Sequence, residues 1–489
     1  MSLVKTASPV AMLLFFVMGI SLWGQASDPE KKPNILFIVS EDNGPEIGCY
    51  GAPVKTPHLD KMASQGTLFR NAYVPQAGCS QSRAAFLTGL YPHQNGQIGL
   101  ATWNYGMYSG EIKNVVKTLS GAGYRTGIIG KLHINPKGAF PFDFKAIPSA
   151  NFSRKDMAAY AENAAKFIKQ SDEAFYLQVN YPDAHRPFIK TVDKLPAKPL
   201  TGKDVDAIPY MGISHPELRQ QTADYYNCMM RVDSYIGDLL QVLEASGKSK
   251  DTVVVYIGDH GADLLRGKRT SYEGGVKIPM IIRWPGIKGG QQRKELVTTL
   301  DLFPTFCEIA GVTIPKSLPG QSLKTIVYGG SPKWRKFLFT EFHVHSNHNP
   351  WPQRTVRGAR YKLIYNPLAG AMNPGYAFTM SRKFFKTPEA ELLEFASKQV
   401  QGAYEIMKQP PKYELYDLET DPFEFKNLAK DLAHAETLGR LKAELTSWQK
   451  RTGDALEDPA LAQKLFSMIR ESGISKKRAL DYKPFMQTQ

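Results

Sequence analysis

Cysteine is scarce in this chain of 489 residues, which contains only four. They stand singly along the sequence, at Cys49, Cys79, Cys228 and Cys307. Proteins that depend on a disulfide framework are denser in cysteine, so this spacing excludes such a framework and allows at most two bridges. With 42% hydrophobic residues, the chain has enough apolar side chains to form a buried core instead.

Long apolar runs are missing after the first residues. The run from Val10 to Ile20 follows Lys5, and Gly24 and Ala26 stand where a signal peptidase needs small residues. This pattern predicts residues 1–26 as a signal peptide that is cut after Ala26. The run is shorter than the ~20 residues of a membrane span, and no later stretch approaches that length. The sequence therefore predicts a secreted or periplasmic protein without stable membrane insertion.

Acidic residues are fewer than basic ones, 46 against 61, which gives a formal net charge of +15. Such a surplus suits a polyanionic partner, although a basic protein can also lack a specific one. The chain has no zinc-knuckle spacing, aromatic RNA-binding strand motif or arginine-rich arm, so nucleic acid is not expected. A sulfated or uronic-acid polysaccharide is the polyanion that remains.

Apolar, β-branched runs alternate with helical patterns through the first two thirds of the chain. Continuous apolar strands separated by helices predict a doubly wound α/β fold with a mostly parallel sheet. The expected strands are 34–40, 125–130, 174–180, 251–259 and 276–286, and the expected helices are 57–65, 82–88, 111–122, 154–170 and 222–246.

The pattern changes near residue 335. The segments 337–344, 354–366 and 412–422 have the composition of short strands joined by turns, and residues 429–450 have that of an amphipathic helix. They predict a smaller α+β unit with an antiparallel sheet. We therefore expect a catalytic α/β domain at 27–335 and a C-terminal subdomain at 336–489.

Charged side chains follow several of the predicted parallel strands. Ligands bind beyond the carboxyl ends of such strands, so these residues are expected to meet. Oxygen ligands suit Ca²⁺ or Mg²⁺, although a single acid after a strand more often caps the next turn. The cationic side chains, joined by Arg83 and Lys268, would stabilise a small tetrahedral oxyanion. The strand-end residues are Glu41, Asp42, Lys131, His133, Asp183, His185, Asp259 and His260.

Lys131 and His133 are two residues apart, so they share a face if the strand continues through them. Cys79 lies just before the expected helix 82–88, where free N–H groups favour anions. A thiolate there would be a reactive nucleophile, whereas a buried thiol would be structural.

The segment "CSQSRAAFLTG", from Cys79 to Gly89, resembles the signature of type I sulfatases, in which this cysteine is oxidised to formylglycine. "GKLH", "GDHG" and "GKRTSYEGG" resemble later motifs of the family, in the same order. The resemblance implies an alkaline-phosphatase-like fold, a sulfated saccharide as substrate and a formylglycine-generating enzyme as partner.

The same resemblance implies roles for individual residues. One Ca²⁺ would be held by Glu41, Asp42, Asp259, His260 and the modified Cys79. Arg83 and His133 would orient and deprotonate the hydrated aldehyde, and Lys131 would bind sulfate. His185 would be the general acid, with Lys268 beside the leaving group.

Three residues depart from the family pattern. Glu41 stands where Asp is usual, His260 where Asn is frequent, and Gln81 where the maturation signal has Pro or Ala. If Gln81 blocks maturation, the protein would be a noncatalytic glycan binder. A phosphodiesterase or phosphonate hydrolase of the same superfamily is the other alternative.

Within the family, "LYPHQNGQIGL" and "YPDAHRPF" are most similar to the heparan N-sulfatase (sulfamidase) branch. Sugar specificity is expected to depend on residues outside the sulfate pocket, each of which could equally be a loop residue without a ligand. These are Trp103, Tyr105, His343, His345, His348 and Arg354.

Overall fold

The structure is a computed structural model that describes residues 1–2, 32–381, 383–473 and 480–486. Residues Lys32–Gln489 form one compact unit. The expected signal peptide lies outside the described residues, apart from its first two. Among the helices of the described part, none has the length and apolar character needed to cross a membrane.

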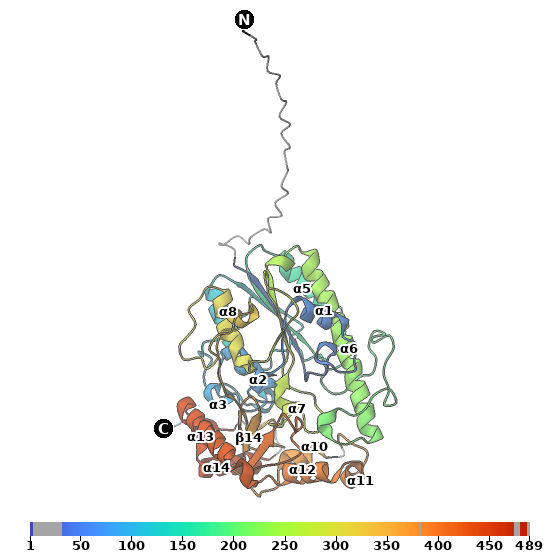
Figure 1. The fold of residues 1–489 in the computed structure, drawn as a ribbon, viewed down its shortest axis with the longest axis vertical. Helices are drawn as coiled ribbons and strands as arrows, with labels where there is room; N and C mark the ends of the chain where they lie inside the picture. Colours follow the sequence, from blue (N-terminus) through green and yellow to red (C-terminus); the bar gives the residue numbers. More distant parts are fainter. Residues whose placement is uncertain (3–31, 382, 474–479, 487–489) are drawn as a thin grey trace. The chain divides into compact units, whose positions relative to one another are not determined.

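An eight-stranded sheet runs through the larger part of the unit (Figure 1). Its central strands are continuous apolar runs, and both of their faces are buried. Strands β5, β4, β6, β1 and β7 are parallel neighbours, which confirms the doubly wound α/β prediction. In sheet order the strands are β10 (Gln291–Arg293), β2 (Thr67–Phe69), β9 (Met280–Arg283), β7 (Thr252–Gly258), β1 (Asn34–Ser40), β6 (Phe175–Tyr181), β4 (Arg125–Gly130) and β5 (Phe144–Ala146).

The strand expected at 276–286 is two strands. Pro279, which has no N–H to donate, separates β8 (Lys277–Ile278) from β9. Strand β9 pairs antiparallel with β7, while β8 joins a three-stranded sheet with β3 (Ala72–Tyr73) and β11 (Val297–Thr298). The sheet is therefore mixed at this edge.

Helices cover both faces of the large sheet (Figure 1). On one face α1 (Pro57–Gln65), α5 (Ala159–Lys169) and α6 (Pro216–Ala245) share a core with Leu36 and Leu177. On the other face lie α2 (Cys79–Thr88), α4 (Val115–Gly121) and α8 (Leu302–Ile309). Helix α2 begins three residues earlier than expected, so Cys79 is its first residue.

The C-terminal part contains the expected antiparallel sheet, whose strands are β12 (Leu338–Phe342), β13 (Gln353–Arg357), β14 (Tyr361–Tyr365) and β15 (Tyr413–Asp417). Helix α13 (Ala435–Thr452) packs on this sheet, where Trp448 stacks on Phe339 with ring centroids 5.1 Å apart. The same core includes Ala85 of α2, so the sheet is joined to the helix that carries Cys79.

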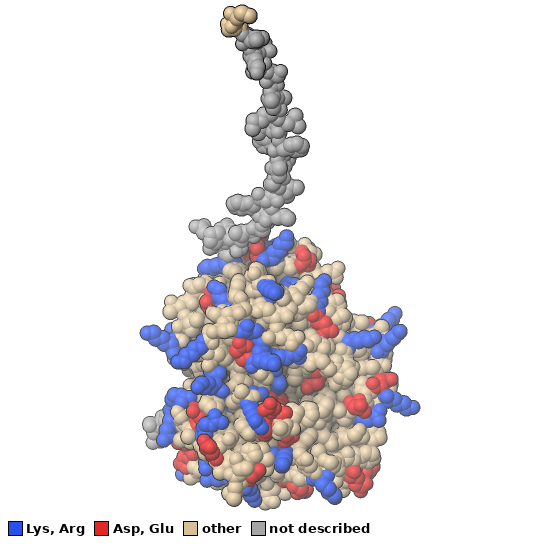
Figure 2. Space-filling model, in the orientation of Figure 1, with Lys and Arg blue, Asp and Glu red and all other residues tan. Residues whose placement is uncertain are grey.

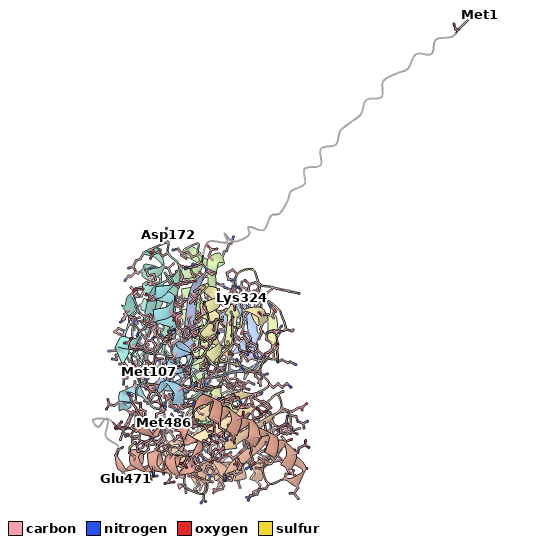
Figure 3. All side chains as sticks on the ribbon, turned by 90° about the vertical axis from the view of Figure 1, so that its left-hand side faces the viewer. Met1, Met107, Asp172, Lys324, Glu471 and Met486 are labelled. Carbon is pink, nitrogen blue, oxygen red and sulfur yellow. The ribbon has the colours of Figure 1, made fainter. Side chains whose placement is uncertain are left out.

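The C-terminal turn packs against an earlier part of the chain. The turn around Met486 lies on the same side of the unit as Met107 (Figure 3), and the Tyr108 hydroxyl donates to the Met486 carbonyl at 3.4 Å.

The remaining elements are short or lie near the C-terminus. These elements are α3 (Pro92–Asn95), α7 (Glu273–Val276), α9 (Lys324–Val327), α10 (Pro374–Thr379), α11 (Glu389–Glu394), α12 (Lys398–Lys408), α14 (Pro459–Glu471) and the 3₁₀ turns Gly48–Tyr50, Ala101–Trp103, Lys137–Ala139, Pro209–Met211, Ser249–Asp251, Thr299–Asp301, Leu432–His434, Ala455–Glu457 and Lys483–Phe485.

Candidate active site

Two neighbouring strands deliver the acidic residues of the site. Strands β1 and β7 pair in parallel up to Ser40 and Gly258, so the residues that follow them meet at one sheet edge. The Asp42 N–H donates to the Asp259 carboxylate at 2.9 Å. The residues after β1 and β7 therefore lie together at this edge of the sheet.

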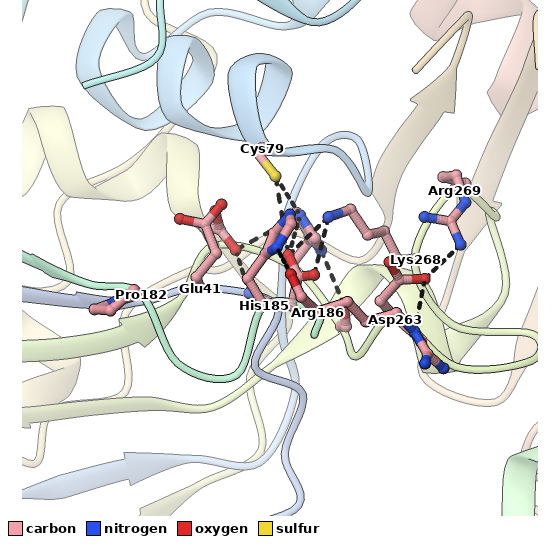
Figure 4. Close-up of polar contacts among 12 residues, drawn as sticks. Glu41, Cys79, Pro182, His185, Arg186, Asp263, Lys268 and Arg269 are labelled. Atoms are coloured by element: carbon pink, nitrogen blue, oxygen red, sulfur yellow. Dashed lines mark hydrogen bonds and ion pairs between the residues drawn. The ribbon is translucent and has the colours of Figure 1, made fainter. Parts of the chain in front are cut away.

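The expected metal-ligating residues lie together. Candidate ligand atoms of Glu41, Asp42, Cys79 and His185 lie within 4.8 Å of one another, as do those of Cys79, Asp259 and His260. Figure 4 shows Cys79 at the start of α2, with its sulfur directed toward this cluster. The cluster thus joins the two strand ends to the helix N-terminus.

Three buried cations neutralise the carboxylates of this cluster. Arg83 contacts Glu41 at 2.9 Å and Asp259 at 3.1 Å, and Lys131 also pairs with Glu41. Lys268 contacts both carboxylate oxygens of Asp42 at 2.9 Å. Burial opposes ionisation of Glu41, but Lys131 and Arg83 hold its pKa well below the usual range. Lys268 likewise helps to hold the pKa of Asp42 below its usual value despite burial, so Glu41 and Asp42 are charged, as cation ligands must be. Burial and the neighbouring Glu41 raise the pKa of Asp259, which would favour a cation bound beside it.

The orientation of His260 favours a cation between it and the two Asp side chains. Its Nδ1 lies 2.9 Å from the Gly261 carbonyl, which can only accept, so Nδ1 carries a proton and donates it. The other ring nitrogen, Nε2, faces Asp42 at 3.2 Å and Asp259 at 3.6 Å. A cation between these groups would take Nε2 and carboxylate oxygens of both Asp side chains as ligands. The donor set therefore fits a bound cation.

Cys79 is a neutral thiol in this environment. Its Sγ lies 3.3 Å from His260 Nε2 and 3.9 Å from an oxygen of Asp42. Burial raises the pKa of the thiol well above its usual value, and Glu41 and Asp259 raise it further against the effect of Lys131 and Lys268. The interpretation of Cys79 as a thiolate nucleophile is therefore not supported.

Gln81, the residue that departs from the family signature, has a structural role in the fold. Its side-chain amide donates to the carbonyls of Val344 at 2.6 Å and Ile98 at 3.3 Å. The side chain is fully buried and ties the first turn of α2 to two separate loops.

His185 is oriented by its neighbours. Its Nδ1 donates to the Arg186 carbonyl at 2.5 Å, and Phe152 stacks on its ring with centroids 3.7 Å apart. Burial lowers the pKa of His185 to about 4. Asp183 does not join the cation cluster, because Arg154 and Arg231 bind its carboxylate at 2.8 and 2.7 Å and so hold the loop before His185 in place.

His133 lies in a loop and not on the strand face where it was expected. Strand β4 ends at Gly130, so His133 does not share a strand face with Lys131, and its backbone is left-handed with φ of 58°. Among the described residues, neither ring nitrogen has a hydrogen-bond partner. Burial, together with the charge of Lys131, lowers the pKa of His133 well below its usual value. The ring is therefore neutral.

One cavity of about 620 Å³ opens from Cys79. Lys131, His133 and His185 line it, which brings these predicted catalytic residues to one space. Several lining residues between β4 and α5 were not predicted from the sequence, although the lysines and aromatics of "NPKGAFPFDFK" were an available signal. The missed residues include Lys137, Phe142, Lys145, Pro148 and Phe152.

Of the residues expected to contact the sugar, His345 lines this cavity. The structure does not bring the others to it. The Tyr105 hydroxyl donates to Asn347 at 2.9 Å, His343 binds Glu341 at 3.1 Å, and Arg354 forms a buried ion pair with Asp454 at 2.6 Å. Trp103 and His348 contact one another edge to face, with ring centroids 5.2 Å apart.

All four cysteines are free thiols, so neither of the two possible bridges forms. On the face drawn in Figure 2, lysine and arginine side chains are interspersed with acidic ones.

Comparison with known proteins agrees with this geometry. Residues 33–312 match the sulfatase family, and residues 258–368 match the C-terminal region described as "N-sulphoglucosamine sulphohydrolase, C-terminal". The human N-sulphoglucosamine sulphohydrolase is 30% identical over 476 residues, which cover 88% of this chain and 93% of the human protein.

Two solved structures share the fold. One is a protein in complex with its substrate D-glucosamine-2-N,6-O-disulfate, with a TM-score of 0.64 and 22% identity, covering 86% of this chain and 98% of the other. The second is the phosphonate monoester hydrolase of Agrobacterium radiobacter, with a TM-score of 0.64 and 20% identity, covering 86% and 96%. The family match and the human relative confirm the resemblance seen in the sequence motifs. The chain therefore belongs to the sulfatase family and is a sulfatase, a hydrolase of sulfuric esters or sulfamates.

Proposed function

We propose that the protein is an exported sulfatase that removes an N- or O-linked sulfate from a sulfated saccharide. The observation that carries this proposal is the cavity at Cys79, whose lining includes Lys131, His133 and His185 but no acidic residue. An anionic substrate can therefore approach position 79 without meeting an exposed carboxylate.

The relatives support a sugar substrate. The human protein is named for N-sulphoglucosamine, and a structural neighbour was solved with a disulfated glucosamine. A hexosamine with an N- or O-sulfate is therefore the substrate class we favour.

Residue 79 is proposed to be formylglycine, because the buried thiol is poorly suited to attack. A hydrated aldehyde at this position would supply an oxygen nucleophile next to the cations. Glu41, Asp42, Asp259 and His260 would hold one Ca²⁺, which would supply positive charge for the sulfate oxygens.

The protein's own side chains have distinct tasks in this proposal. Lys131 and Lys268 lie beside the anion site and stabilise the charge of the sulfate oxygens. Arg83 orients Glu41 and Asp259, and neutral His133 accepts a proton. His185 gives a proton to the sugar oxygen or nitrogen when its bond to sulfur breaks. The negative charge of bound sulfate favours the imidazolium form that this step needs.

Release of inorganic sulfate tests the reaction. Purified protein from the native host is incubated with N-sulfoglucosamine, with glucosamine 6-O-sulfate and with an aryl sulfate, and a Cys79→Ala variant is the control. We expect sulfate release by the wild type and none above background by the variant. Equal release by the variant would overturn the proposal.

An aryl phosphodiester in the same assay distinguishes the phosphodiesterase and phosphonate hydrolase alternative. That alternative is supported by the Agrobacterium enzyme, which has the same fold. A shared fold does not distinguish a phosphonate hydrolase from a sulfatase. Higher kcat/KM for the phosphorus compound would favour it. Binding of sulfated saccharide with no turnover of any substrate would favour the noncatalytic binder.

Export is proposed from the sequence of residues 1–26, and the division into 27–335 and 336–489 remains a prediction. N-terminal sequencing of protein from the periplasm or medium of the native host is expected to begin at Ser27. Retention of the whole leader on protein found inside the cell would contradict export.

A further inference from the structure

Two lysines of the cavity have no task in the reaction described above. Lys145 lies in β5 and is the register partner of Ile128 in β4, so the two side chains share one face of the sheet. Lys137 begins a 3₁₀ turn in the loop after β4. Both line the same cavity as Cys79, and both are exposed.

These two lysines differ from the lysines next to Cys79 in their partners. Lys131 and Lys268 are each paired with a buried carboxylate. Within the described part of the chain, the ammonium groups of Lys137 and Lys145 have no hydrogen bond or ion pair, and no Asp or Glu lines the cavity. The positive charge of this part of the cavity is therefore not neutralised by the protein.

The walls of the cavity strengthen the effect of these charges. Phe142, Phe152 and Pro148 line it together with Ile128. An apolar wall lowers the local dielectric constant and strengthens attraction between a lysine and an anion. Exposed lysines on an open surface would lack this environment.

The size of the cavity leaves room for more than the sulfate that is removed. Its volume of about 620 Å³ lies in the range of sites that enclose a whole organic ligand, far larger than one sulfate needs. The sugar that carries the scissile sulfate, and groups attached to it, would extend from Cys79 toward these lysines.

We propose that Lys137 and Lys145 form a second anion subsite, which binds a carboxylate or sulfate of the saccharide other than the sulfate that is removed. This inference rests on the proposed function, because it assumes that the scissile sulfate lies at residue 79. The enzyme would therefore prefer saccharides with two anionic groups over those with one.

Substrates that differ by one anionic group test the subsite. The wild type is assayed with N-sulfoglucosamine, with the same sugar bearing a 6-O-sulfate, and with N-sulfoglucosamine joined to either a uronic acid or a neutral sugar. We expect kcat/KM to rise about tenfold with the second anion, and the rise to shrink at high salt. The 6-O-sulfate and uronate arms show which anion the subsite takes.

Variants assign the effect to the two lysines. Lys137→Ala/Lys145→Ala is expected to reduce the preference to about twofold or less, whereas Lys137→Arg/Lys145→Arg retains it. Lys155→Ala removes an exposed lysine that does not line the cavity, and is expected to leave the preference unchanged. A full preference in the double alanine variant, or no preference in the wild type, would overturn the subsite.

Measurements of saccharide binding distinguish failure of the second anion subsite from failure of the proposed sulfatase function. The ratio of Kd values for the one-anion and two-anion saccharides is measured in the Cys79→Ala background, where turnover is not needed. A ratio that depends on Lys137 and Lys145 supports the subsite even if no sulfate is released. A ratio near one contradicts it even if sulfate is released.

Discussion

The rings of Phe152 and His185 stack face to face, with centroids 3.7 Å apart and planes 7° apart. Lys131 Nζ lies 5.0 Å from the centroid of the same Phe152 ring. One aromatic side chain thus contacts two of the proposed catalytic residues, and it fixes the ring that is proposed to protonate the leaving group.

This contact gives a graded prediction for turnover. His185→Ala removes the proposed proton donor and is expected to lower kcat by about 10²–10⁴-fold. Phe152→Leu keeps an apolar side chain but loses the stacked ring, so we expect a smaller decrease in kcat. Both variants should retain the circular dichroism spectrum of the wild type. Near-normal kcat in His185→Ala would remove this residue from the reaction.

Arg354 is expected to act on stability through its buried pair with Asp454. Both side chains are almost inaccessible, and Arg354→Ala leaves the Asp454 charge buried without its ion-pair partner, with only a hydrogen bond from the Gln449 side chain and one from a backbone N–H. We expect the free energy of unfolding to fall by about 3–5 kcal/mol, measured by urea titration.

A charge-free pair is the matched control for Arg354. Arg354→Met/Asp454→Leu removes both charges and is expected to recover much of the lost stability. If Arg354→Ala instead raised KM for the saccharide without lowering stability, the original assignment of Arg354 to substrate binding would be correct.

Glu46 predicts a pH dependence of stability. Burial raises the pKa of this carboxyl to about 7, against the effect of its hydrogen bond from Tyr225. The native state therefore keeps a proton that the unfolded state releases, so this group's contribution is complete below pH 4.5, the ordinary pKa, and is lost as pH rises through 7.

Glu46→Gln removes this titration while keeping an acceptor for Tyr225. At pH 8 the variant is expected to exceed the wild type by up to about 3 kcal/mol in the free energy of unfolding, with little difference at pH 4. Urea unfolding at both pH values measures this. If the difference in the free energy of unfolding between Glu46→Gln and the wild type were the same at pH 4 and pH 8, the raised pKa of Glu46 would be contradicted.

Calcium is expected to stabilise the folded protein. Ligand at a hundredfold excess over Kd adds about 2.7 kcal/mol if it binds only the native state, so Tm should rise on addition of Ca²⁺ and fall with a chelator. Asp259→Ala removes a proposed ligand and should abolish the rise. Asp172→Ala removes an exposed carboxylate (Figure 3) and should retain it. An equal rise in both variants would show that the cation binds elsewhere.

The central sheet and the charged cluster could be predicted because both follow from strand patterns. Residues that follow parallel strands lie at one edge of the sheet, so the strand assignment predicts that Asp42 and Asp259 share this edge. Their direct contact also requires β1 and β7 to be neighbours, which the sequence pattern does not reveal. The apolar runs of β1 and β7 made that assignment clear.

Loop residues could not be placed in the same way. Arg354 was expected at the sugar because nothing near it in sequence reveals Asp454, its partner 100 residues later. Lys137 and Lys145 were missed because the loop after β4 and the three-residue strand β5 are too short or irregular to show a periodicity that indicates which side chains face a cavity. Cys79 needed the structure too, since burial and neighbouring carboxylates determine the state of its thiol.

The most direct test of the sulfatase proposal is the mass of the tryptic peptide from Asn71 to Arg83, which contains Cys79 as its one cysteine. The protein is taken from its native host, and the peptide is treated with a hydroxylamine probe so that a hydrated aldehyde is also detected. We expect a form that is lighter than the cysteine peptide by about 18 Da and that reacts with the probe. Unmodified cysteine in all of the peptide, from protein that nevertheless releases sulfate, would contradict the formylglycine mechanism.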